Sequence, residues 1–355
     1  MAALNVGLIG CGGIARQVHL EVLTRLPNVE LVALAEPDPQ RRDWASRRAP
    51  TSLAFAGYEE LLQVPNLDAV VICLPNALHA EATVAALQRG KHVYLEKPLA
   101  TSLDEARCVL AAWRRAGVVG MIGFNFRSSW LYQTARRHLQ ANTLGELVGA
   151  RSIFSTPARP LPGWKQTRRS GGGVLLDLAS HHVDLVSYVF GQDVRAVFAS
   201  LRSQRSEGDS AVLQLWLADG LPVQSLYALN AVDEDRIEIY GLAGKLAVSR
   251  YPSLGVEITR PTDNFRLVHV KRLWRGVQSL RHSPRWLSKL RAPGHEPSYG
   301  TALARFVAAA RAHQPASPDF EDGYRSLAVV EAAEESARTG RIVSVADFAD
   351  AAYPR

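Results

Sequence analysis

A run of small residues near the start of the chain constrains the fold more than any other feature. The run Gly10-Cys11-Gly12-Gly13-Ile14-Ala15 follows a short apolar stretch, Asn5 to Ile9, and leads into helical spacing from Ile14 to Leu26. Glycine at position 10 permits a tight turn, and glycine at position 12 lets phosphate groups come close to the backbone. Ala15 allows the following helix to pack on the strand, and the N–H groups at the helix start would stabilise an anion. Strand, glycines and helix in this order predict a dinucleotide-binding fold.

An acidic residue closes the next predicted strand, Leu31 to Ala35. Glu36 stands at about the distance from the glycines where a carboxylate binds ribose hydroxyls. A carboxylate there repels a 2′-phosphate, so NAD is favoured over NADP as the cofactor. Arg41 and Arg42 follow closely and keep NADP open as the alternative; otherwise these arginines cover the adenine or are simply solvated.

The arrangement of predicted elements indicates an α/β protein with two domains. The first third of the chain alternates β-branched runs with helical patterns, which predicts βαβ units and a doubly wound parallel sheet of the Rossmann type over residues 1–122. In the remainder, residues 123–355, five strand-like runs follow one another between Val194 and Ser249 without intervening helices. Strands in series predict an antiparallel sheet, flanked here by helical segments.

Polar residues follow two of the predicted parallel strands, at the edge where ligands bind in such sheets. Leu74-Pro75-Asn76-Ala77-Leu78-His79 follows the strand that ends at Cys73. Asn76 would cap the next helix, or the turn would present backbone groups to nicotinamide, and the two are compatible. Glu96-Lys97-Pro98 follows the next strand. Lys97 there would polarise a carbonyl or pass a proton, and the alternative is a surface charge, the usual fate of lysine.

A further polar group lies on one predicted helix, Val174 to Phe190. Asp177, His181 and Asp184 stand at i, i+4 and i+7 and share one face. Two acids beside a histidine would raise its proton affinity and orient its ring, which suits a general acid/base. His182 points about 100° away, and we interpret it as a packed structural histidine. A metal site is the alternative, but no thiol or further His/Glu cluster completes a ligand shell, so we expect no metal.

In this combination the motifs resemble the Gfo/Idh/MocA family, the relatives of glucose–fructose oxidoreductase and inositol dehydrogenase. The resemblance covers nearly the whole chain, and Ala179, where the family often has glycine, is one small departure. The shared elements are Gly10-x-Gly12-x-x-Ala15, Pro75-Asn76-x-x-His79, Glu96-Lys97-Pro98, Gly123-Phe124-Asn125 and Asp177-x-x-x-His181-x-x-Asp184.

The resemblance implies a Rossmann domain joined to an α+β domain with a large open, mostly antiparallel sheet, with the active site in the crevice between them. It implies a catalytic group of Lys97, Asp177 and His181, and it places Asn125, Trp164 and Lys165 among the substrate contacts with Asp177 and His181. For Trp164 and Lys165 the alternative is that they are ordinary loop residues. The candidate cofactor-binding residues are Gly10, Gly12, Gly13, Ile14, Ala15, Glu36, Arg41, Pro75, Asn76, His79, Glu96 and Lys97.

The expected function is that of an NAD(P)-dependent oxidoreductase acting on a secondary alcohol or ketone of a sugar, cyclitol or sugar derivative. His181 would take the hydroxyl proton, Lys97 would hydrogen-bond the same oxygen, and Asp177 would orient the substrate and the histidine. Two alternatives stay open: a glycoside hydrolase that uses transient oxidation by tightly held NAD, and a catalytically silent NAD-binding regulatory protein. All three polar residues together argue against the silent protein.

The positive net charge of +7 is partly local. From Arg266 to Arg291 there are eight Lys or Arg and no Asp or Glu, and apolar residues recur at helical spacing between Val270 and Leu290. We interpret this basic segment, about 265–295, as an insertion that packs on the same protein or on a neighbouring subunit. The alternatives are a helix in peripheral contact with a membrane through 265–291, and a lid over an anionic substrate. Nucleic acid is disfavoured, because no binding motif accompanies the charge.

The cysteines and the apolar runs indicate the compartment. Cys11, Cys73 and Cys108 are odd in number and have no metal or redox spacing, the start of the chain has no secretory signal, and no apolar run approaches the roughly 18 residues of a membrane span. We therefore expect a reduced, cytoplasmic protein with no integral membrane segment. It would act on a small sugar or polyol and assemble as a homo-oligomer, either a dimer or a tetramer.

Overall fold

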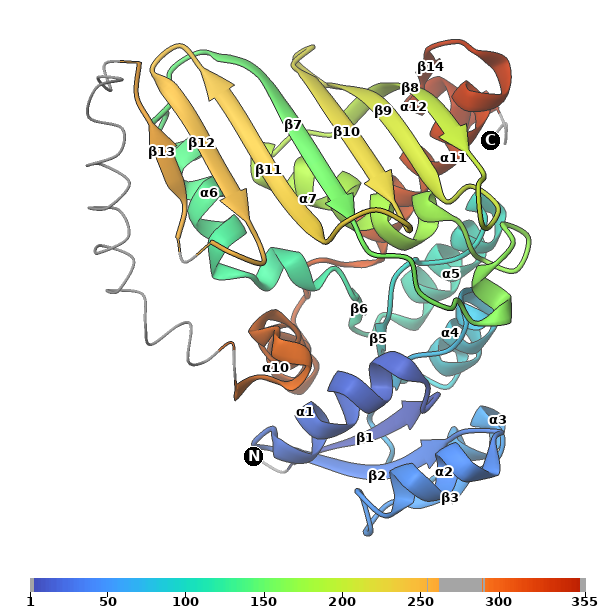
Figure 1. The fold of residues 1–355 in the computed structure, drawn as a ribbon. Helices are drawn as coiled ribbons and strands as arrows, with labels where there is room; N and C mark the ends of the chain where they lie inside the picture. Colours follow the sequence, from blue (N-terminus) through green and yellow to red (C-terminus); the bar gives the residue numbers. More distant parts are fainter. Residues whose placement is uncertain (1–2, 254, 262–288, 290, 352–355) are drawn as a thin grey trace. The chain divides into compact units, whose positions relative to one another are not determined.

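The computed structural model describes residues 3–253, 255–261, 289 and 291–351, and the chain forms two compact units (Figure 1). The first unit comprises Met1–Ser128, Arg169–Gly171 and Ala292–Leu327. The second comprises Ser129–Arg168, Gly172–Arg291 and Ala328–Arg355.

The first unit is built on a six-stranded parallel sheet with the order β3-β2-β1-β4-β5-β6. The strands are β1 (Leu4–Ile9), β2 (Val29–Ala35), β3 (Leu53–Phe55), β4 (Ala69–Ile72), β5 (His92–Leu95) and β6 (Gly120–Ile122). From β1 the chain moves outward to β3 and then returns to the other side of β1 with β4. The predicted doubly wound parallel sheet is confirmed, and the reversal between β1 and β4 creates the crevice where such sheets bind ligands.

Helices connect these strands, and local signals explain where several of them begin and end. The Ser102 hydroxyl caps α5 by accepting a hydrogen bond from the Glu105 amide, and the helix ends at Gly117. The helical elements of this unit are a π-helical turn (Ala15–His19) continued by α1 (Leu20–Arg25), α2 (Pro39–Ser46), α3 (Tyr58–Leu61), α4 (His79–Gln88), α5 (Leu103–Ala116) and α10 (Pro297–Ala312), with short 3₁₀ turns at Asn76–Leu78, Asn125–Ser128 and Pro293–His295.

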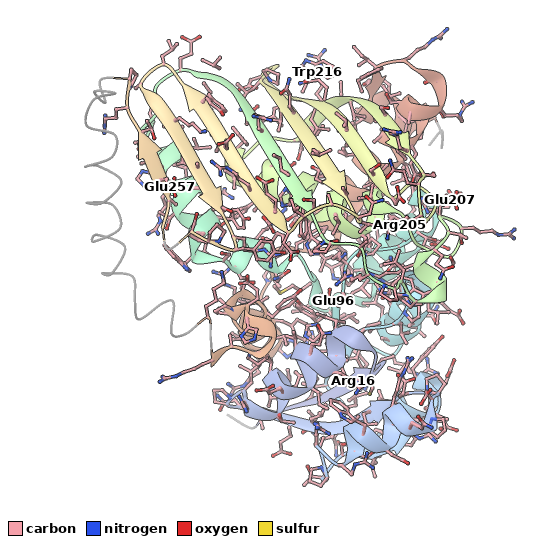
Figure 2. All side chains as sticks on the ribbon, in the orientation of Figure 1. Arg16, Glu96, Arg205, Glu207, Trp216 and Glu257 are labelled. Carbon is pink, nitrogen blue, oxygen red and sulfur yellow. The ribbon has the colours of Figure 1, made fainter. Side chains whose placement is uncertain are left out.

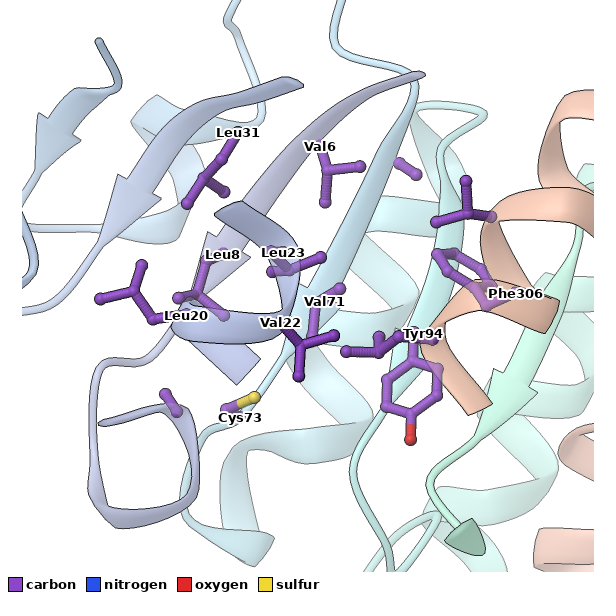
Figure 3. Close-up of a cluster of buried hydrophobic side chains, with 14 of the residues drawn as sticks. Val6, Leu8, Leu20, Val22, Leu23, Leu31, Val71, Cys73, Tyr94 and Phe306 are labelled. Atoms are coloured by element: carbon purple, nitrogen blue, oxygen red, sulfur yellow. The ribbon is translucent and has the colours of Figure 1, made fainter. Parts of the chain in front are cut away.

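The core of the first unit joins residues from distant parts of the sequence (Figure 3). Val6 and Leu8 of β1 are buried together with Leu23 of α1 and with Phe306 of α10. Phe306 is fully buried, so α10 belongs to this unit, although it follows the second sheet in the chain. The division predicted from the sequence, 1–122 and 123–355, placed α10 in the second domain, whereas in the structure it packs in the first unit.

The second unit contains a mixed eight-stranded sheet with the order β13-β12-β11-β7-β10-β9-β8-β14. Every strand pair is antiparallel except β10 with β7, which confirms the predicted mostly antiparallel sheet. The strands are β7 (Leu147–Ser155), β8 (Val194–Arg202), β9 (Ser210–Leu217), β10 (Pro222–Ala228), β11 (Glu234–Gly241), β12 (Gly244–Ser249), β13 (Glu257–Thr259) and β14 (Val343–Ser344).

The described helices of this unit cover one face of the sheet, and no described helix covers the other (Figure 1). Along β9 the side chains alternate, because Leu213 and Leu215 are buried while Val212 is 56% exposed. The helical elements are α6 (Trp130–Gln140), a π-helical turn (Leu175–Ala179) continued by α7 (Ser180–Phe190), α11 (Phe320–Thr339), which lies in this unit from Ala328 on, and α12 (Val345–Ala351), with a 3₁₀ turn at Gly163–Lys165.

Two expectations concern membranes. Among the described residues, no helix is both long and apolar enough to cross a membrane. The basic segment predicted at 265–295, with its helical spacing from Val270 to Leu290 and its three interpretations, lies largely outside the described residues.

In the first unit a buried histidine at the start of β5 contacts the residue directly before β6. The His92 Nδ1 atom accepts a hydrogen bond of 2.9 Å from the Val119 amide. The rings of His92 and His313 lie 5.1 Å apart. Burial lowers the pKa of His92, the neighbouring His313 lowers it further, and Asp68 opposes these effects. The folded protein therefore favours neutral His92, and its unprotonated Nδ1 atom can accept the hydrogen bond from the Val119 amide.

We predict that stability falls as the pH drops below about 6.5, the pKa of a histidine in an unfolded chain. Because the folded-state pKa of His92 is depressed, the unfolded state gains its proton first, and stability is lost until the pH passes the folded-state pKa. Thermal unfolding measured between pH 8 and pH 5 should show the decline. His92→Asn, whose amide oxygen can accept the hydrogen bond from the Val119 amide, should make the decline shallower, while another buried histidine with a lowered pKa keeps its share of it. An equally steep decline in this variant would contradict the assignment to His92.

Candidate active site

The turn after β1 has the geometry expected of a phosphate-binding loop. Gly10 has φ +89°, and a Cβ atom there would lie 2.7 Å from the Cys73 carbonyl oxygen. A Cβ atom on Gly12 or Gly13 would meet nothing within 4 Å. The fold itself thus requires glycine at position 10 but not at 12 or 13. The space above Gly12 lies at the start of the helical segment that begins at Ala15, and it fits a bound phosphate.

Glu36 anchors this turn from the end of β2. It is 5% exposed, and its carboxylate accepts hydrogen bonds from the Cys11 amide at 2.8 Å and the Asp38 amide at 3.1 Å. A carboxylate has about four acceptor positions, so both ribose hydroxyls could still donate to it. The Arg42 guanidinium donates to the Glu36 carbonyl oxygen at 2.8 Å, and Arg41 is exposed. These residues fit the adenosine half of NAD.

The turns after β4 and β5 meet because the two strands are neighbours in the sheet. His79 is 1% exposed and ties them together: its Nδ1 lies 2.6 Å from the Pro98 carbonyl oxygen and its Nε2 lies 2.9 Å from that of Leu74. Burial lowers the pKa of His79, and the two carbonyl contacts oppose that effect. Both ring nitrogens are used inside the protein, so the structure gives His79 the role of holding the two turns that flank Pro75 and Lys97.

The sequence reasoning missed a buried pair next to Lys97. The His19 Nε2 atom lies 2.7 Å from the Glu96 Oε1 atom, and the two residues are 0% and 7% exposed (Glu96 is labelled in Figure 2). The pair joins the helical segment after the glycine turn to the end of β5, directly before the partly exposed Lys97. In the sequence, His19 stands next to Val18 and three positions before Val22, two apolar residues of the predicted helix. That position on the buried side of the helix was the signal that could have indicated a buried histidine with a polar partner.

Asn125, predicted among the substrate contacts, lies in the interior of the first unit. It is fully buried in the first unit, where its side-chain amide donates to the Ser298 hydroxyl at 2.8 Å. Ser298 belongs to the start of α10, so Asn125 helps to hold α10 on this unit. A direct contact between Asn125 and the substrate stays a prediction.

In the second unit the structure brings together Trp164, Lys165 and Asp177. The Lys165 ammonium donates to the Asp177 carboxylate at 2.8 Å and lies 5.3 Å from the centre of the Trp164 ring. Asp177 sits in the π-helical turn, and His181 follows in the first turn of α7; each is 8% exposed. The sequence predicted the helix but not the π-helical turn, a feature that often occurs at functional sites. Because Asp177 is paired with Lys165, its predicted influence on His181 stays a prediction.

His182 is a structural residue, as predicted, but it lies in a polar network. It is 0% exposed, with Nδ1 2.7 Å from the Ser152 hydroxyl and Nε2 3.2 Å from the Asp235 carboxylate. Asp235 also accepts hydrogen bonds from Tyr132 at 2.6 Å and from Arg250 at 2.6 Å. Burial alone would raise the pKa of Asp235, but the Arg250 guanidinium and His182 hold it well below its usual range. The network fixes α7 to the sheet beside His181.

Among the described residues, no group of three or more His, Cys, Asp or Glu is placed to hold a metal ion. The structure thus holds a glycine turn with a buried carboxylate beside it, a lysine at the edge of the parallel sheet, and an Asp–His helix in an α+β unit. Together the fold and these groups define a two-domain oxidoreductase of the NAD-binding Rossmann class.

Comparison with known proteins gives the family. Residues 4–124 match the oxidoreductase family with an NAD-binding Rossmann fold, and residues 132–247 match the Gfo/Idh/MocA C-terminal domain. The chain is 30% identical over 346 residues to 1,5-anhydro-D-fructose reductase of Ensifer adhaerens, which covers 96% of this chain and 98% of that protein. It is 26% identical over 350 residues to myo-inositol 2-dehydrogenase of Thermotoga maritima, with 96% and 98% covered.

A solved structure supports the same fold. Levoglucosan dehydrogenase in complex with NADH and levoglucosan superposes with a TM-score of 0.81 at 23% identity, over 97% of this chain and 99% of that one. The chain belongs to the Gfo/Idh/MocA family of NAD-dependent oxidoreductases.

We predict opposite outcomes for alanine at two neighbouring glycines. Gly10→Ala should lower the melting temperature, because its Cβ would collide with the Cys73 carbonyl and a positive φ costs about 1–2 kcal/mol for an L-residue. Gly12→Ala should leave the melting temperature unchanged and weaken NAD binding, since its Cβ meets only the space left for phosphate. Calorimetry and NAD titration of both variants check this. Unchanged NAD affinity in Gly12→Ala would contradict the phosphate site.

Proposed function

We propose that this protein is an NAD-dependent dehydrogenase or reductase that transfers a hydride between nicotinamide and the carbon of a secondary alcohol or ketone in a sugar, cyclitol or sugar derivative. The named relatives, a 1,5-anhydro-D-fructose reductase and a myo-inositol 2-dehydrogenase, support this substrate class. So does the polar character of the candidate substrate residues, Lys165, Asp177 and His181.

The order of the groups along the parallel sheet carries the proposal. Glu36 follows β2, the glycine turn follows β1, and Lys97 follows β5, in a sheet with the order β2-β1-β4-β5. If Glu36 binds the adenosine ribose and the glycine turn binds the pyrophosphate, an extended dinucleotide continues across β4 toward β5. Its nicotinamide end then lies on the side of Lys97, the residue assigned to the reacting oxygen.

The bound cofactor supplies hydride acceptance and donation. In the oxidative direction, His181 accepts the proton of the substrate hydroxyl as the hydride leaves the same carbon. Lys97 donates a hydrogen bond to that oxygen and stabilises the charge that develops on it. Asp177 accepts a hydrogen bond from a neighbouring substrate hydroxyl, in exchange for part of its contact with Lys165. The reductive direction reverses these proton transfers.

Glu36 also supports a preference for NAD over NADP. A 2′-phosphate would approach a buried carboxylate whose oxygens already accept two backbone hydrogen bonds. The Arg42 guanidinium is engaged by the carbonyl oxygens of Glu36 and Pro37 rather than directed outward. Repulsion between the two anions therefore disfavours NADP.

We predict that the purified protein reduces NAD with at least one compound from a panel of cyclitols, sugars, sugar acids and nucleotide sugars, and reduces NADP poorly. Lys97→Ala and His181→Ala should each lower kcat at least about a hundredfold, because each removes a group that acts on the reacting oxygen. The assay is NADH absorbance at a fixed pH, with NAD affinity measured separately by fluorescence. Glycoside cleavage without net NADH would instead favour the hydrolase, and tight NAD binding without turnover of any compound would favour the silent binding protein.

We also propose that the open face of the eight-stranded sheet pairs with the same face of a second copy of the chain. This pairing gives a dimer, or a tetramer built from two such dimers. Three large apolar side chains are exposed on this face over β8 to β10, beside the exposed polar residues Ser200 and Gln224: Phe198 is 40% exposed, Val212 56% and Leu226 42%. Leu226 and Val212 stand directly opposite each other on neighbouring strands. Contiguous apolar surface of this kind on a sheet is typical of an interface.

We predict that Leu226→Glu shifts the protein to a smaller mass, because it places a charge in the centre of the proposed interface. Leu53→Glu is the matched control, since Leu53 is an apolar residue, 55% exposed, in the first unit. Light scattering after gel filtration measures both masses. A monomeric wild type, or equal masses for Leu226→Glu and wild type, would contradict pairing through this face.

The proposed location is the cytoplasm. All three cysteines are free thiols, and Cys11 and Cys73 are buried, as is common in a reducing compartment. Burial raises the pKa of Cys11 to about 12, with the nearby Glu36 adding to the effect, so this thiol near the cofactor turn stays protonated and inert.

A further inference from the structure

The side chain of Asn76 has a partner that its place in the sequence did not suggest. Of its two suggested roles, that of a helix cap is wrong: neither the turn Asn76–Leu78 nor α4 has a side-chain cap hydrogen bond. The Asn76 amide nitrogen instead donates a buried hydrogen bond of 2.7 Å to the Gly171 carbonyl oxygen. Asn76 is 6% exposed, and both residues belong to the first unit.

Glycine is required at the partner position. Gly171 has φ +92°, and a Cβ atom there would lie 2.6 Å from the Asn76 Cβ atom. At the next residue, Gly172, a Cβ atom would lie 2.2 Å from the Lys165 carbonyl oxygen, and the Gly172 amide donates to the Thr167 carbonyl at 2.8 Å. The chain can therefore run this close to Asn76 and fold back on itself only because these positions lack side chains.

The hydrogen bond between Asn76 and Gly171, called the clip below, lies at the start of the segment 171–177. This segment ends at the candidate substrate residue Asp177. Asn76 lies in the turn after β4, on the side of the sheet assigned to nicotinamide. Asp177 follows Gly171 by six positions in the chain, and its amide donates to the Gly173 carbonyl at 3.0 Å. The segment from Gly171 to Asp177 thus begins at a fixed backbone contact with the cofactor-side turn.

We propose that Asn76 is a positioning residue for the reaction: through the Gly171 carbonyl it fixes the start of the segment that carries Asp177. The inference rests on the proposed function, because Asp177 is taken to contact the substrate. The sequence placed Asn76 among the candidate cofactor-binding residues, but its side-chain amide is used by the Gly171 carbonyl. We therefore expect its substitution to affect substrate binding and turnover and to leave the affinity for NAD nearly unchanged, since the turn would contact NAD through its backbone. Small displacements of groups that orient a substrate reduce rates strongly, by about a hundredfold for an ångström.

Asn76→Asp tests this with little change of shape. A carboxylate has no N–H to donate and repels the Gly171 carbonyl. We expect kcat/KM for the polyol substrate to fall about 10- to 100-fold, with the dissociation constant for NAD within twofold of wild type. Asn76→Ala, which removes the amide without adding charge, should likewise lower kcat/KM and leave the dissociation constant for NAD within twofold of wild type. Asn142→Asp, in an exposed turn, is the matched control and should behave as wild type.

Amide hydrogen exchange provides a readout that does not depend on turnover. Loss of the clip should speed exchange in peptides that cover residues 166–174, where the Gly172 amide is bonded to Thr167, and leave β1 and β4 protected. A wild type that never reduces NAD would defeat the proposed function, and the exchange data would still decide whether the clip exists.

Two results would overturn the proposal. If the dissociation constant for NAD rises in step with the loss of kcat/KM, Asn76 is a cofactor contact and not a positioning residue. If Asn76→Asp equals Asn142→Asp in both kcat/KM and exchange, the clip has no effect on the reaction.

Discussion

The close approach of β1 to β4 at Gly10 is the constraint on which the cofactor site depends. At this point the Cys73 amide donates to the Ile9 carbonyl at 2.8 Å, and the Cys73 carbonyl lies where a side chain at position 10 would have to be. The backbone must therefore turn immediately after Ile9, which directs the following amides toward Glu36 and the start of the helix. The absence of a side chain at Gly10 thus sets the turn, its contact with the Glu36 carboxylate and the position of the helix terminus, the groups that we propose bind ribose and pyrophosphate.

Two candidate reactive residues, Lys97 and His181, each stand next to a buried polar neighbour in the chain. Glu96, paired with His19, precedes Lys97, and His182, paired with Ser152 and Asp235, follows His181. Consecutive residues at a strand end or on a helix point in different directions, so one side chain can be fixed in the interior while the next faces the ligand. Burying such groups costs free energy unless they are fully hydrogen-bonded. We interpret these pairs as supports that hold the reactive side chains in a narrow range of positions.

Local periodicity was sufficient for most of the fold. For example, β5 (His92–Leu95) comes soon after Gly90, and α5 (Leu103–Ala116) lies between its cap Ser102 and Gly117, so glycine and serine mark the ends of these elements in the sequence. The three-residue strands β3 and β13 were missed, since so few residues carry no period. The parallel pairing of β10 with β7 and the return of α10 to the first unit depend on contacts between distant segments, which no local pattern encodes.

The site was predictable as a set of residue types but not as a set of partners. Periodicity shows that a side chain such as His19 faces inward, but the group it meets lies 77 positions away in the chain. The same limit explains Asn76, whose place before a helix suggested a cap, while its amide is satisfied 95 positions later. The glycines at 171 and 172 look like a flexible loop in the sequence. In the structure, side chains there would overlap Asn76 and the Lys165 carbonyl, so these glycines allow close backbone packing rather than freedom of motion.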